Sequence, residues 1–460
     1  MTTHAIAVIG AGASGTLLAL HLLRRAPPGT RVTLIDRNAP FGPGLAYATG
    51  NANHLLTVPA GRMSAFVDQP RPFVDWLERQ SAQLLGGVQP TEASFVPRRL
   101  YGAYLRHLLN RELQNTALDL VHDRVTAIDG TVLQLASGRT IASDLVVLAT
   151  GNDRPAFPCD APAVGTSPYW RSDPWAPDAF SALDTEASVL LIGTGLTMVD
   201  AVITLLDQGH AGPIHAVSRR GLLPRSHASG ATAPPLQRKL PGGLRELTRL
   251  VRGQITSSGD GWRDMIDALR PFTQEIWQAL SIEDRRRFLR HLRPWWDVHR
   301  HRMPPSVAAR IDAARASGQL RVYAGRITDF PTSERGTDAQ LRLRDGRAKT
   351  LLVARAVNCS GPCTDVTRSD DPLLRALLRD GQARADDCRL GLDATTAGAL
   401  RGRDGTVSQT LFALGPLTRG ALWEITAIPE IRRQCEVLAL HLSDLLREQA
   451  QQRHMILAYA

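Results

Sequence analysis

The sequence predicts an α/β protein with two similar strand–helix–strand units, one at the N-terminus and one near the middle of the chain. In each unit a short apolar run precedes a glycine-rich turn and then a segment with helical periodicity. The chain of 460 residues also exceeds one ordinary domain, because single cores stop growing at about 250–300 residues. Hydrophobic residues make up 43% and charged residues 21% of it, a balance that can bury a large core.

The basic charge of the chain does not indicate nucleic-acid binding. The net charge is +10, and nearly all basic residues are arginines, since Lys239 and Lys349 are the only lysines. The arginines are interleaved with acids, and aromatic residues make up only 5%, whereas nucleic-acid binders gather basic residues in stripes. No apolar run reaches the roughly 20 residues of a membrane span, so we expect no membrane partner. Five sparse cysteines without a Cys-x-x-Cys pair favour a cytoplasmic protein.

The first unit begins with a β-branched run at residues 5–9. A glycine turn follows at residues 10–15, then a helix over 16–25 and a second strand over 31–35, which ends in Asp36. This order of strand, glycine turn, helix, strand and acid is typical of a dinucleotide-binding domain. The contact residues predicted here are Gly10, Gly12, Ser14, Gly15, Asp36 and Arg37.

Each residue of this pattern has a physical reason. Gly10 permits the tight turn, Gly12 lets the backbone approach a pyrophosphate, and Gly15 lets the helix pack close to the strand. The helix N-terminus offers unpaired N–H groups and a positive dipole to the phosphates. Asp36 would accept hydrogen bonds from a ribose.

The second unit has a strand at residues 188–192, a turn at 193–198, a helix over 199–206 and a strand at 215–218. Met198 replaces the third glycine, so the helix should lie slightly further from the strand. No acid follows the last strand, and arginines there suit a 2′-phosphate, which an Asp would repel. The alternative is that Arg219 and Arg220 are solvent-exposed residues at the end of a strand and have no binding role. The contact residues predicted here are Gly193, Gly195, Thr197, Ser218, Arg219 and Arg220.

Two such sites in one chain are most economically explained by FAD in the first and NADPH in the second. Two more buried strands, at residues 144–151 and 356–362, end in small residues that let the chain leave the sheet beside a dinucleotide. Thr150 and Gly151 are therefore predicted to contact FAD.

The sequence resembles the flavoproteins with two dinucleotide-binding domains, most closely a group of bacterial FAD/NAD(P)-binding proteins, and more distantly N-hydroxylating and other class B flavin monooxygenases. The Phe-x-Gly-x-x-x-His fingerprint of Baeyer–Villiger enzymes is absent, and the proline after Gly151 falls one residue early for an N-hydroxylase signature. The motifs that carry the resemblance are residues 10–15, 44–47, 54–60, 63–66, 97–102, 193–200, 296–303, 415–420 and 423–424.

The resemblance implies two Rossmann-like domains. The FAD domain would be discontinuous, formed by residues 1–155 and 356–460, and the NAD(P) domain would span 185–355. A helical insertion at 226–305 would interrupt the second domain, because this stretch has no strand pattern. Residues 155–177, rich in proline and tryptophan, would form a linker.

The resemblance also places residues near the flavin. Met63 and Ser64 would contact the edge of the ring, and Gly415 and Gly420 would let the C-terminal segment pass close by. A helix starting near Gly420 would point its N-terminus at the flavin. We interpret His54 as a satisfied loop histidine in preference to a catalytic one.

The basic segment around residue 300 allows two interpretations. Arg300 or Arg302 meets a nucleotide phosphate or an acidic substrate, or the segment is a solvated basic surface. His299 and His301 alternate with these arginines, in a strand or a turn, and lack a third ligand nearby. We therefore expect no metal.

The expected function is that of an FAD-dependent NADPH oxidoreductase. NADPH would deliver a hydride to flavin N5, and reduced flavin would use dioxygen to hydroxylate a small nucleophilic amine or sulfur substrate. The alternatives are a reductase that does not oxygenate and a non-catalytic flavin-binding regulator. We identify no catalytic side chain, because the cofactor supplies the chemistry; the oligomeric state stays open.

Overall fold

The computed structural model describes residues 4–80, 89–114, 117–156, 167–228, 240–256, 261–333 and 336–459. It divides the chain into two compact units. Unit 1 comprises Met1–Gly50, Val58–Asn152 and Thr364–Ala460, and unit 2 comprises Asn51–Thr57 and Asp153–Cys363. The division after residue 152 lies beside the expected boundary at 155, whereas the chain returns to unit 1 at residue 364 and not at 356. That the short segment Asn51–Thr57 joins unit 2 was not expected from the sequence.

Unit 1 is built on a six-stranded sheet in the order β16-β17-β7-β1-β2-β3. All neighbours are parallel except β16 and β17. Strands β1 and β7 are apolar and largely buried along their length, as is usual for parallel strands covered on both faces. The strands are β1 (Ala5–Ile9), β2 (Arg31–Asp36), β3 (Leu118–His122), β7 (Leu145–Leu148), β16 (Ala399–Arg401) and β17 (Val407–Ala413).

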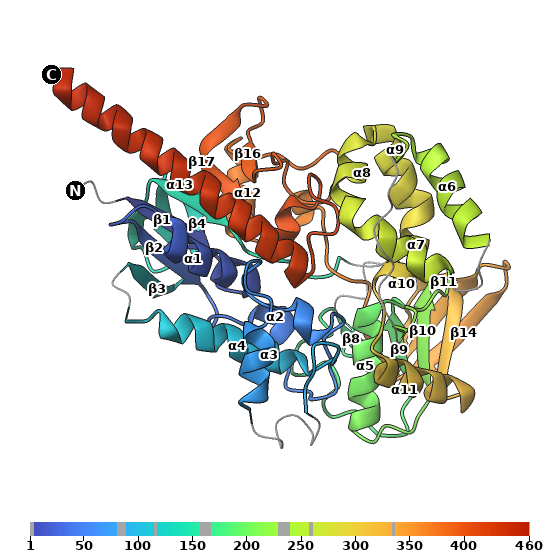
Figure 1. The fold of residues 1–460 in the computed structure, drawn as a ribbon. Coiled ribbons are helices and arrows are strands. Elements are labelled where there is room, and N and C mark those ends of the chain that lie inside the picture. Colours follow the sequence, from blue (N-terminus) through green and yellow to red (C-terminus); the bar gives the residue numbers. More distant parts are fainter. Residues whose placement is uncertain are drawn as a thin grey trace. The chain divides into compact units, whose positions relative to one another are not determined.

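Helices and a small antiparallel sheet complete unit 1. Helix α1 packs along the long helix α13, as Figure 1 shows. The small sheet has the order β4-β5-β6. The helices are α1 (Ala13–Arg25), α2 (Gly44–Tyr47), η1 (Ala60–Arg62), α3 (Pro72–Glu78), α4 (Arg98–Arg111), η5 (Val366–Arg368), α12 (Pro372–Arg379), η6 (Gly415–Thr418) and α13 (Ile428–Tyr459), and the strands are β4 (Val125–Asp129), β5 (Val132–Leu135) and β6 (Thr140–Ala142).

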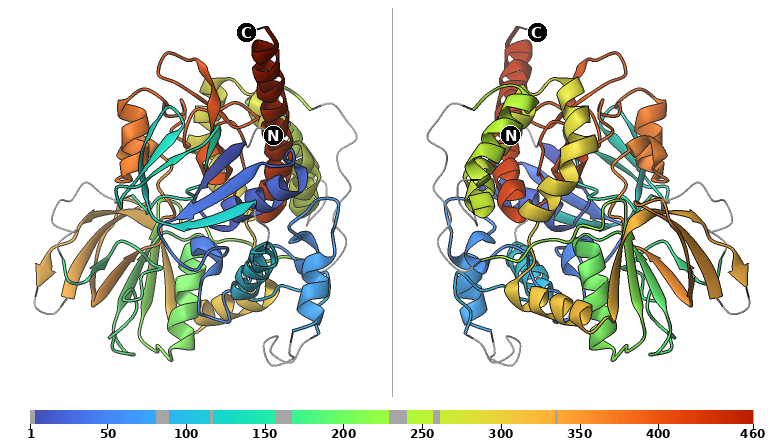
Figure 2. Two further views of the ribbon diagram at one scale, coloured as in Figure 1. Left: turned by 90° about the vertical axis from the view of Figure 1, so that its left-hand side faces the viewer. Right: turned by 90° about the vertical axis from the view of Figure 1, so that its right-hand side faces the viewer.

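Unit 2 contains an eight-stranded sheet in the order β12-β13-β11-β10-β9-β15-β8, with β14 paired to β13. Strands β8 to β11 and β15 are parallel, and β11 to β14 continue as an antiparallel ribbon, shown mainly in orange in Figure 2. The strands are β8 (Trp170–Arg171), β9 (Val189–Ile192), β10 (Ile214–Ser218), β11 (Leu320–Asp329), β12 (Thr332–Ser333), β13 (Gly336–Leu343), β14 (Ala348–Val353) and β15 (Arg355–Asn358).

Part of the predicted linker, residues 155–177, belongs to the sheet of unit 2. Strand β8 within it pairs with β15, although residues 157–166 lie outside the described part of the chain.

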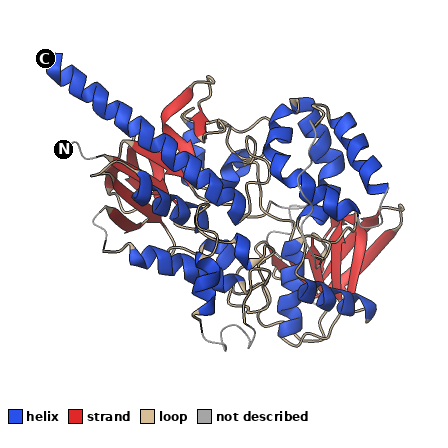
Figure 3. Ribbon diagram, viewed as in Figure 1, coloured by secondary structure: helices blue, strands red, loops and turns tan. Residues whose placement is uncertain are grey.

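The stretch from 226 to 305 is helical in its described part, as predicted, and Figure 3 shows these helices grouped together. Ser226 and Met303 form an isolated bridge that closes the base of the insertion. Residues 229–239 and 257–260 of this stretch lie outside the described residues. The helices of unit 2 are α5 (Leu196–Asp207), α6 (Leu244–Thr256), α7 (Gly261–Leu269), η3 (Arg270–Phe272), α8 (Thr273–Ala279), α9 (Ile282–Arg287), the π-helical turn η4 (Phe288–Leu292), α10 (Arg293–Arg300) and α11 (Pro305–Ala316).

Two expectations about helices require correction. The C-terminal helix begins at Ile428 and not near Gly420, because Glu424 has a φ of +68°, a left-handed conformation that no helix continues. His299 lies within α10 and His301 caps its end, so this segment is neither strand nor plain turn. No described helix is both long and apolar enough to cross a membrane.

Candidate functional site

In unit 1 the chain connections on the two sides of β1 diverge at its carboxyl end. Strand β1 pairs with β2 on one side and with β7 on the other. Ligands of open α/β sheets bind at the carboxyl ends of strands at such a point. Gly10 stands there with a φ of +107°, and a Cβ on it would overlap the carbonyl group of Ala149. Only glycine fits this position.

The other glycines of the first turn allow close contacts of the backbone. A Cβ on Gly15 would overlap the carbonyl oxygen of Gly10, so α1 starts directly against the end of β1, as expected. Gly12 caps α1 without a side-chain hydrogen bond. A Cβ on Gly12 would lie 3.4 Å from the Cα of Gly44. The loop before α2 thus approaches the turn at Gly12, a contact that the spacing of the motif did not reveal.

Asp36 holds the glycine turn from the end of β2. Its Oδ2 accepts a hydrogen bond from the backbone N–H of Ala11 at 2.7 Å, and its Oδ1 accepts one from Asn38 at 2.8 Å. An ionised carboxylate offers about four lone-pair sites, so Asp36 retains capacity for ribose hydroxyls. Arg37 is exposed and forms an ion pair of 3.5 Å with Asp371.

The C-terminal part of unit 1 reaches the start of α1. Gly415 has a φ of +69°, and a Cβ on it would lie 2.9 Å from the Oγ of Ser14. The Oε1 atom of Gln434 accepts the Gly415 N–H at 2.9 Å and fixes this approach. After β7, Thr150 is exposed, and Gly151 has a φ of +76° with open space where a Cβ would stand. Gly10, Gly15, Ser14 and Gly415 therefore lie together around the start of α1, and Asp36 reaches the same turn from β2.

Three residues expected to contact the flavin are instead packed against other parts of the protein. Met63 and Ser64 are 1% and 0% exposed. The Ser64 hydroxyl donates to the Gln69 carbonyl. A Cβ on Gly420 would overlap the side chain of Asp386, so packing accounts for this glycine. The structure presents none of the three on an open surface for the flavin, because neighbouring side chains and backbone already cover them.

Unit 2 repeats the arrangement at the end of β9, which pairs with β10 and β15. Gly193 has a φ of +114°, and a Cβ on it would overlap the carbonyl group of Cys359. Gly195 caps α5 and is exposed, and a Cβ on it would have no described atom within 4 Å. Thr197 is half-buried in the first turn of α5. The N-terminus of α5 is therefore accessible to a phosphate.

The polar residues after β10 divide into two groups. The Ser218 hydroxyl accepts hydrogen bonds from the Thr194 hydroxyl at 2.8 Å and the Gly221 N–H at 3.0 Å, so it closes the loop. Arg219 is exposed, and its side chain makes no hydrogen bond or ion pair to another described residue. Arg220 instead donates to the backbone carbonyls of His291 at 3.1 Å and Arg290 at 3.4 Å. Of the two arginines, Arg219 is therefore the one whose side chain no described residue holds.

Other residues singled out in the sequence have structural roles. The Nε2 of His54 lies 2.9 Å from the Thr204 hydroxyl, consistent with a satisfied loop histidine. Arg302 is only 6% exposed and forms an ion pair of 3.0 Å with Asp267, so it is neither a surface residue nor available to a phosphate. Met198 is fully buried in the core of unit 2.

Comparisons with known proteins agree with this geometry. Residues 7–153 match a family model described as FAD-NAD(P)-binding. No curated protein matches the chain by sequence. Among solved structures, L-lysine 6-monooxygenase from Pseudomonas syringae is 16% identical with a TM-score of 0.64, over 97% of this chain and 99% of that one.

Two further solved structures have the same fold. Ornithine N-hydroxylase from Kutzneria sp. 744, solved with reduced FAD, NADP⁺ and L-ornithine, is 13% identical with a TM-score of 0.63, over 97% of this chain and all of that one. Bacillithiol disulfide reductase from Bacillus cereus is 14% identical with a TM-score of 0.50, over 96% of this chain and 99% of that one. These comparisons confirm the predicted α/β fold class and the resemblance in fold to flavoproteins with two dinucleotide-binding domains, and the family model identifies residues 7–153 as FAD-NAD(P)-binding.

Proposed function

We propose that this protein is an FAD-dependent monooxygenase that uses NADPH and hydroxylates a small nucleophilic substrate at nitrogen or sulfur. The observation that carries the proposal is the duplicated strand end. In each unit a glycine of positive φ packs against the chain that leaves the neighbouring parallel strand, at Gly10 and Ala149 and again at Gly193 and Cys359. One chain thereby holds two dinucleotide crevices, which hydride transfer between two cofactors requires.

The residues of unit 1 fit FAD. The exposed Thr150 and the open space at Gly151 leave room beside the N-terminus of α1, whose unpaired N–H groups would hold the pyrophosphate. Asp36 would accept from the ribose while it keeps the Ala11 N–H. When bound, FAD supplies the chemistry of hydride acceptance and reaction with dioxygen.

The residues of unit 2 fit NADPH. The accessible N-terminus of α5 at Gly195 would hold the pyrophosphate, and the guanidinium of Arg219 would pair with a 2′-phosphate. No described acid side chain accepts from the Arg219 side chain, so its charge is available to the nucleotide.

Two of the described thiols, those of Cys359 and Cys435, do not suit exchange with a disulfide substrate, whereas Cys363 and Cys388 are half-buried. Burial raises the pKa of the Cys359 and Cys435 thiols, which are 2% and 0% exposed. Neutral buried thiols are poor nucleophiles in disulfide exchange. The higher TM-scores to the lysine and ornithine hydroxylases also favour oxygenation over the reductase alternative.

Anaerobic reduction followed by labelled oxygen tests the proposal. The purified flavoprotein is reduced with NADPH without air, then mixed with ¹⁸O₂ and L-ornithine, L-lysine, cadaverine or methionine. Bleaching of the flavin and a product that carries one ¹⁸O atom are expected.

Two results would contradict the proposal. Reoxidation that yields only hydrogen peroxide across the panel, together with NADPH-dependent reduction of bacillithiol disulfide, would assign a reductase. If NADPH does not bleach the flavin, the result would favour the alternative of a non-catalytic flavin-binding regulator.

A further inference from the structure

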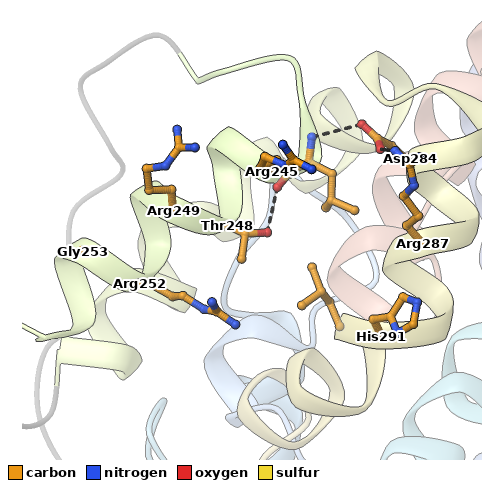
Figure 4. A pocket seen from close by; sticks show the side chains of 10 residues that line it. Arg245, Thr248, Arg249, Arg252, Gly253, Asp284, Arg287 and His291 are labelled. Carbon is orange, nitrogen blue, oxygen red and sulfur yellow. Dashed lines mark hydrogen bonds and ion pairs between the residues drawn. The ribbon is translucent and has the colours of Figure 1, made fainter.

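A basic pocket lies within the helical insertion of unit 2, between α6 on one side and α9 with the turn η4 on the other. This open pocket has a volume of about 820 Å³, in the range of pockets that bind small organic molecules. Figure 4 shows Arg245 and Arg249 on the upper side of this view, and Arg252 on the lower side, toward the wall that carries His291. The pocket is lined by Leu244, Arg245, Thr248, Arg249, Arg252, Gly253, Asp284, Arg287, His291 and Leu292.

Asp284, the one acid among the described lining residues, does not neutralise the positive charge of the pocket. Asp284 accepts the N–H of Leu244 at 3.2 Å and pairs with Arg287 at 3.0 Å, so its carboxylate holds the start of α6 to α9. Arg245 and Arg249 are exposed, and neither side chain pairs with another described residue. They stand four residues apart on one helix, where like charges destabilise each other.

The pocket also has an apolar part. Leu244 is buried and Leu292 half-buried, and the stems of the arginines add aliphatic surface. A ligand that matches this lining carries at least two negative charges and an apolar body. Guanidinium groups pair with the planar or tetrahedral oxygens of carboxylates and phosphates through two hydrogen bonds at once.

The wall of the pocket is held in place by unit 2 itself. His291 lines the pocket from the π-helical turn η4, and its carbonyl accepts the hydrogen bond from Arg220 at 3.1 Å. Single π-helical turns within helices are frequent at functional sites. The turn that carries His291 is thus attached to the end of β10.

We propose that this pocket binds a small organic anion with two or more negative charges, of the phosphate-ester or polycarboxylate type. The site is separate from the two strand ends that we assign to FAD and NADPH. Its lining residues come from the insertion alone, and none of them is among the residues we assign to the cofactors.

Calorimetric titration tests the pocket in the FAD-loaded protein saturated with NADP⁺, so that the nucleotide site is filled. The probes are 1-naphthyl phosphate, citrate, inorganic pyrophosphate and neutral 1-naphthol. The pocket variant carries Arg245→Gln, Arg249→Gln and Arg252→Gln. Its matched control carries Arg326→Gln, Arg342→Gln and Arg344→Gln, which remove the same charge from exposed positions on β11, β13 and the turn after β13.

We expect 1-naphthyl phosphate, which has both charge and an apolar body, to bind the unmodified protein more tightly than neutral 1-naphthol and more tightly than inorganic pyrophosphate, with citrate as the polycarboxylate comparison. The pocket variant should weaken that binding by about tenfold or more, since each lost charged hydrogen bond contributes roughly 1.5–3 kcal/mol. The control should bind as the unmodified protein does. Preference for the phosphate or for citrate decides the head group.

The proposal is overturned if no anionic probe binds at millimolar concentration, or if both variants lose binding equally. Flavin content and NADPH-dependent bleaching of the pocket variant show that it is folded. Flavin content and bleaching report on the cofactor sites, whereas the titration reports on the pocket. The anion titration can therefore be interpreted even if the protein proves not to be a monooxygenase.

Discussion

The carboxylate of Asp36 accepts a hydrogen bond of 2.7 Å from the backbone N–H of Ala11, which lies 25 residues earlier in the glycine turn. The acid expected to recognise a ribose therefore also fixes the turn that would hold the pyrophosphate. Parallel pairing of β1 with β2 brings the two residues to the same edge of the sheet.

Asp36→Ala is expected to weaken FAD binding by about 10- to 100-fold, because hydrogen bonds to a charged group contribute roughly 1.5–3 kcal/mol each. Asp36→Asn should weaken it less, since the amide oxygen can still accept from Ala11. Fluorescence titration of the apoprotein with FAD measures both. Asp119→Ala, which removes an exposed carboxylate from β3, serves as the control. An Asp36→Ala protein with unchanged affinity would show that the ribose is held elsewhere.

Gly12→Val is expected to abolish FAD binding. The new side chain starts 3.4 Å from the Cα of Gly44, and its methyl groups would displace the neighbouring loop or occupy the space of the phosphates. The ratio of flavin to protein absorbance in the purified variant checks this. Gly50→Val is the control, because Gly50 is exposed and has open space at its Cβ position. A folded Gly12→Val protein with full flavin would refute the assignment of the first site.

Gly195→Val is expected to block NADPH and to spare both FAD and stability. Gly195 has a φ of −85°, which valine adopts readily, and no described protein atom lies within 4 Å of the added Cβ. Only a ligand at the N-terminus of α5 would meet the new methyl groups. Stopped-flow bleaching should slow at a given NADPH concentration, while the thermal midpoint and flavin content stay unchanged. Normal bleaching would remove Gly195 from the site.

Arg219→Ala and Arg220→Ala are expected to differ. Arg219→Ala should raise the dissociation constant for NADPH by about tenfold or more and leave that for NADH nearly unchanged, because one charged hydrogen bond to phosphate contributes about 1.5–3 kcal/mol. Arg220→Ala should instead loosen η4 through the lost bonds to the Arg290 and His291 carbonyls. Anaerobic reduction with each nucleotide separates the two effects. Equal affinities for NADPH and NADH in the unmodified protein would contradict the role of Arg219.

Stability should fall on acidification because two buried histidines, His21 and His215, and the half-buried His227 remain neutral in the fold. Burial lowers the pKa of His21, His215 and His227 from 6.5 to about 4. Between these values the unfolded state binds more protons than the native state, so stability is present above about pH 6.5 and is lost as the pH falls toward 4. The loss is at most about 1.4 kcal/mol per pH unit for each histidine.

Urea unfolding at a series of pH values checks this dependence. His227→Gln should reduce the slope of stability against pH, whereas His122→Gln, at an exposed position, should not. A slope unchanged in His227→Gln would mean that this histidine is already protonated in the fold.

Local patterns determined the architecture. An apolar run, a glycine turn and a helical period lie within about 25 residues of one another, so the sequence alone locates Gly10, Gly15, Gly193 and the strands that precede them. The absence of a strand pattern likewise predicts the helical insertion. Within it, the Ser281 hydroxyl caps α9 by accepting the N–H of Asp284 at 3.2 Å. These features depend on residues that are close together in the chain, so the spacing of residue types in the sequence is enough to predict them.

Only the tertiary structure decided which residues meet across the fold. Gly415 reaches Ser14 from the opposite end of the chain, Gly44 faces Gly12, and Arg220 turns from the nucleotide crevice to the carbonyl of His291. The sequence could not separate Arg219 from Arg220, because adjacent residues of one type carry the same local signal. Their roles differ because side chains diverge at a strand end and one finds backbone carbonyls while the other meets solvent. Pairing of distant segments depends on how whole sheets and helices pack, and no residue spacing encodes it.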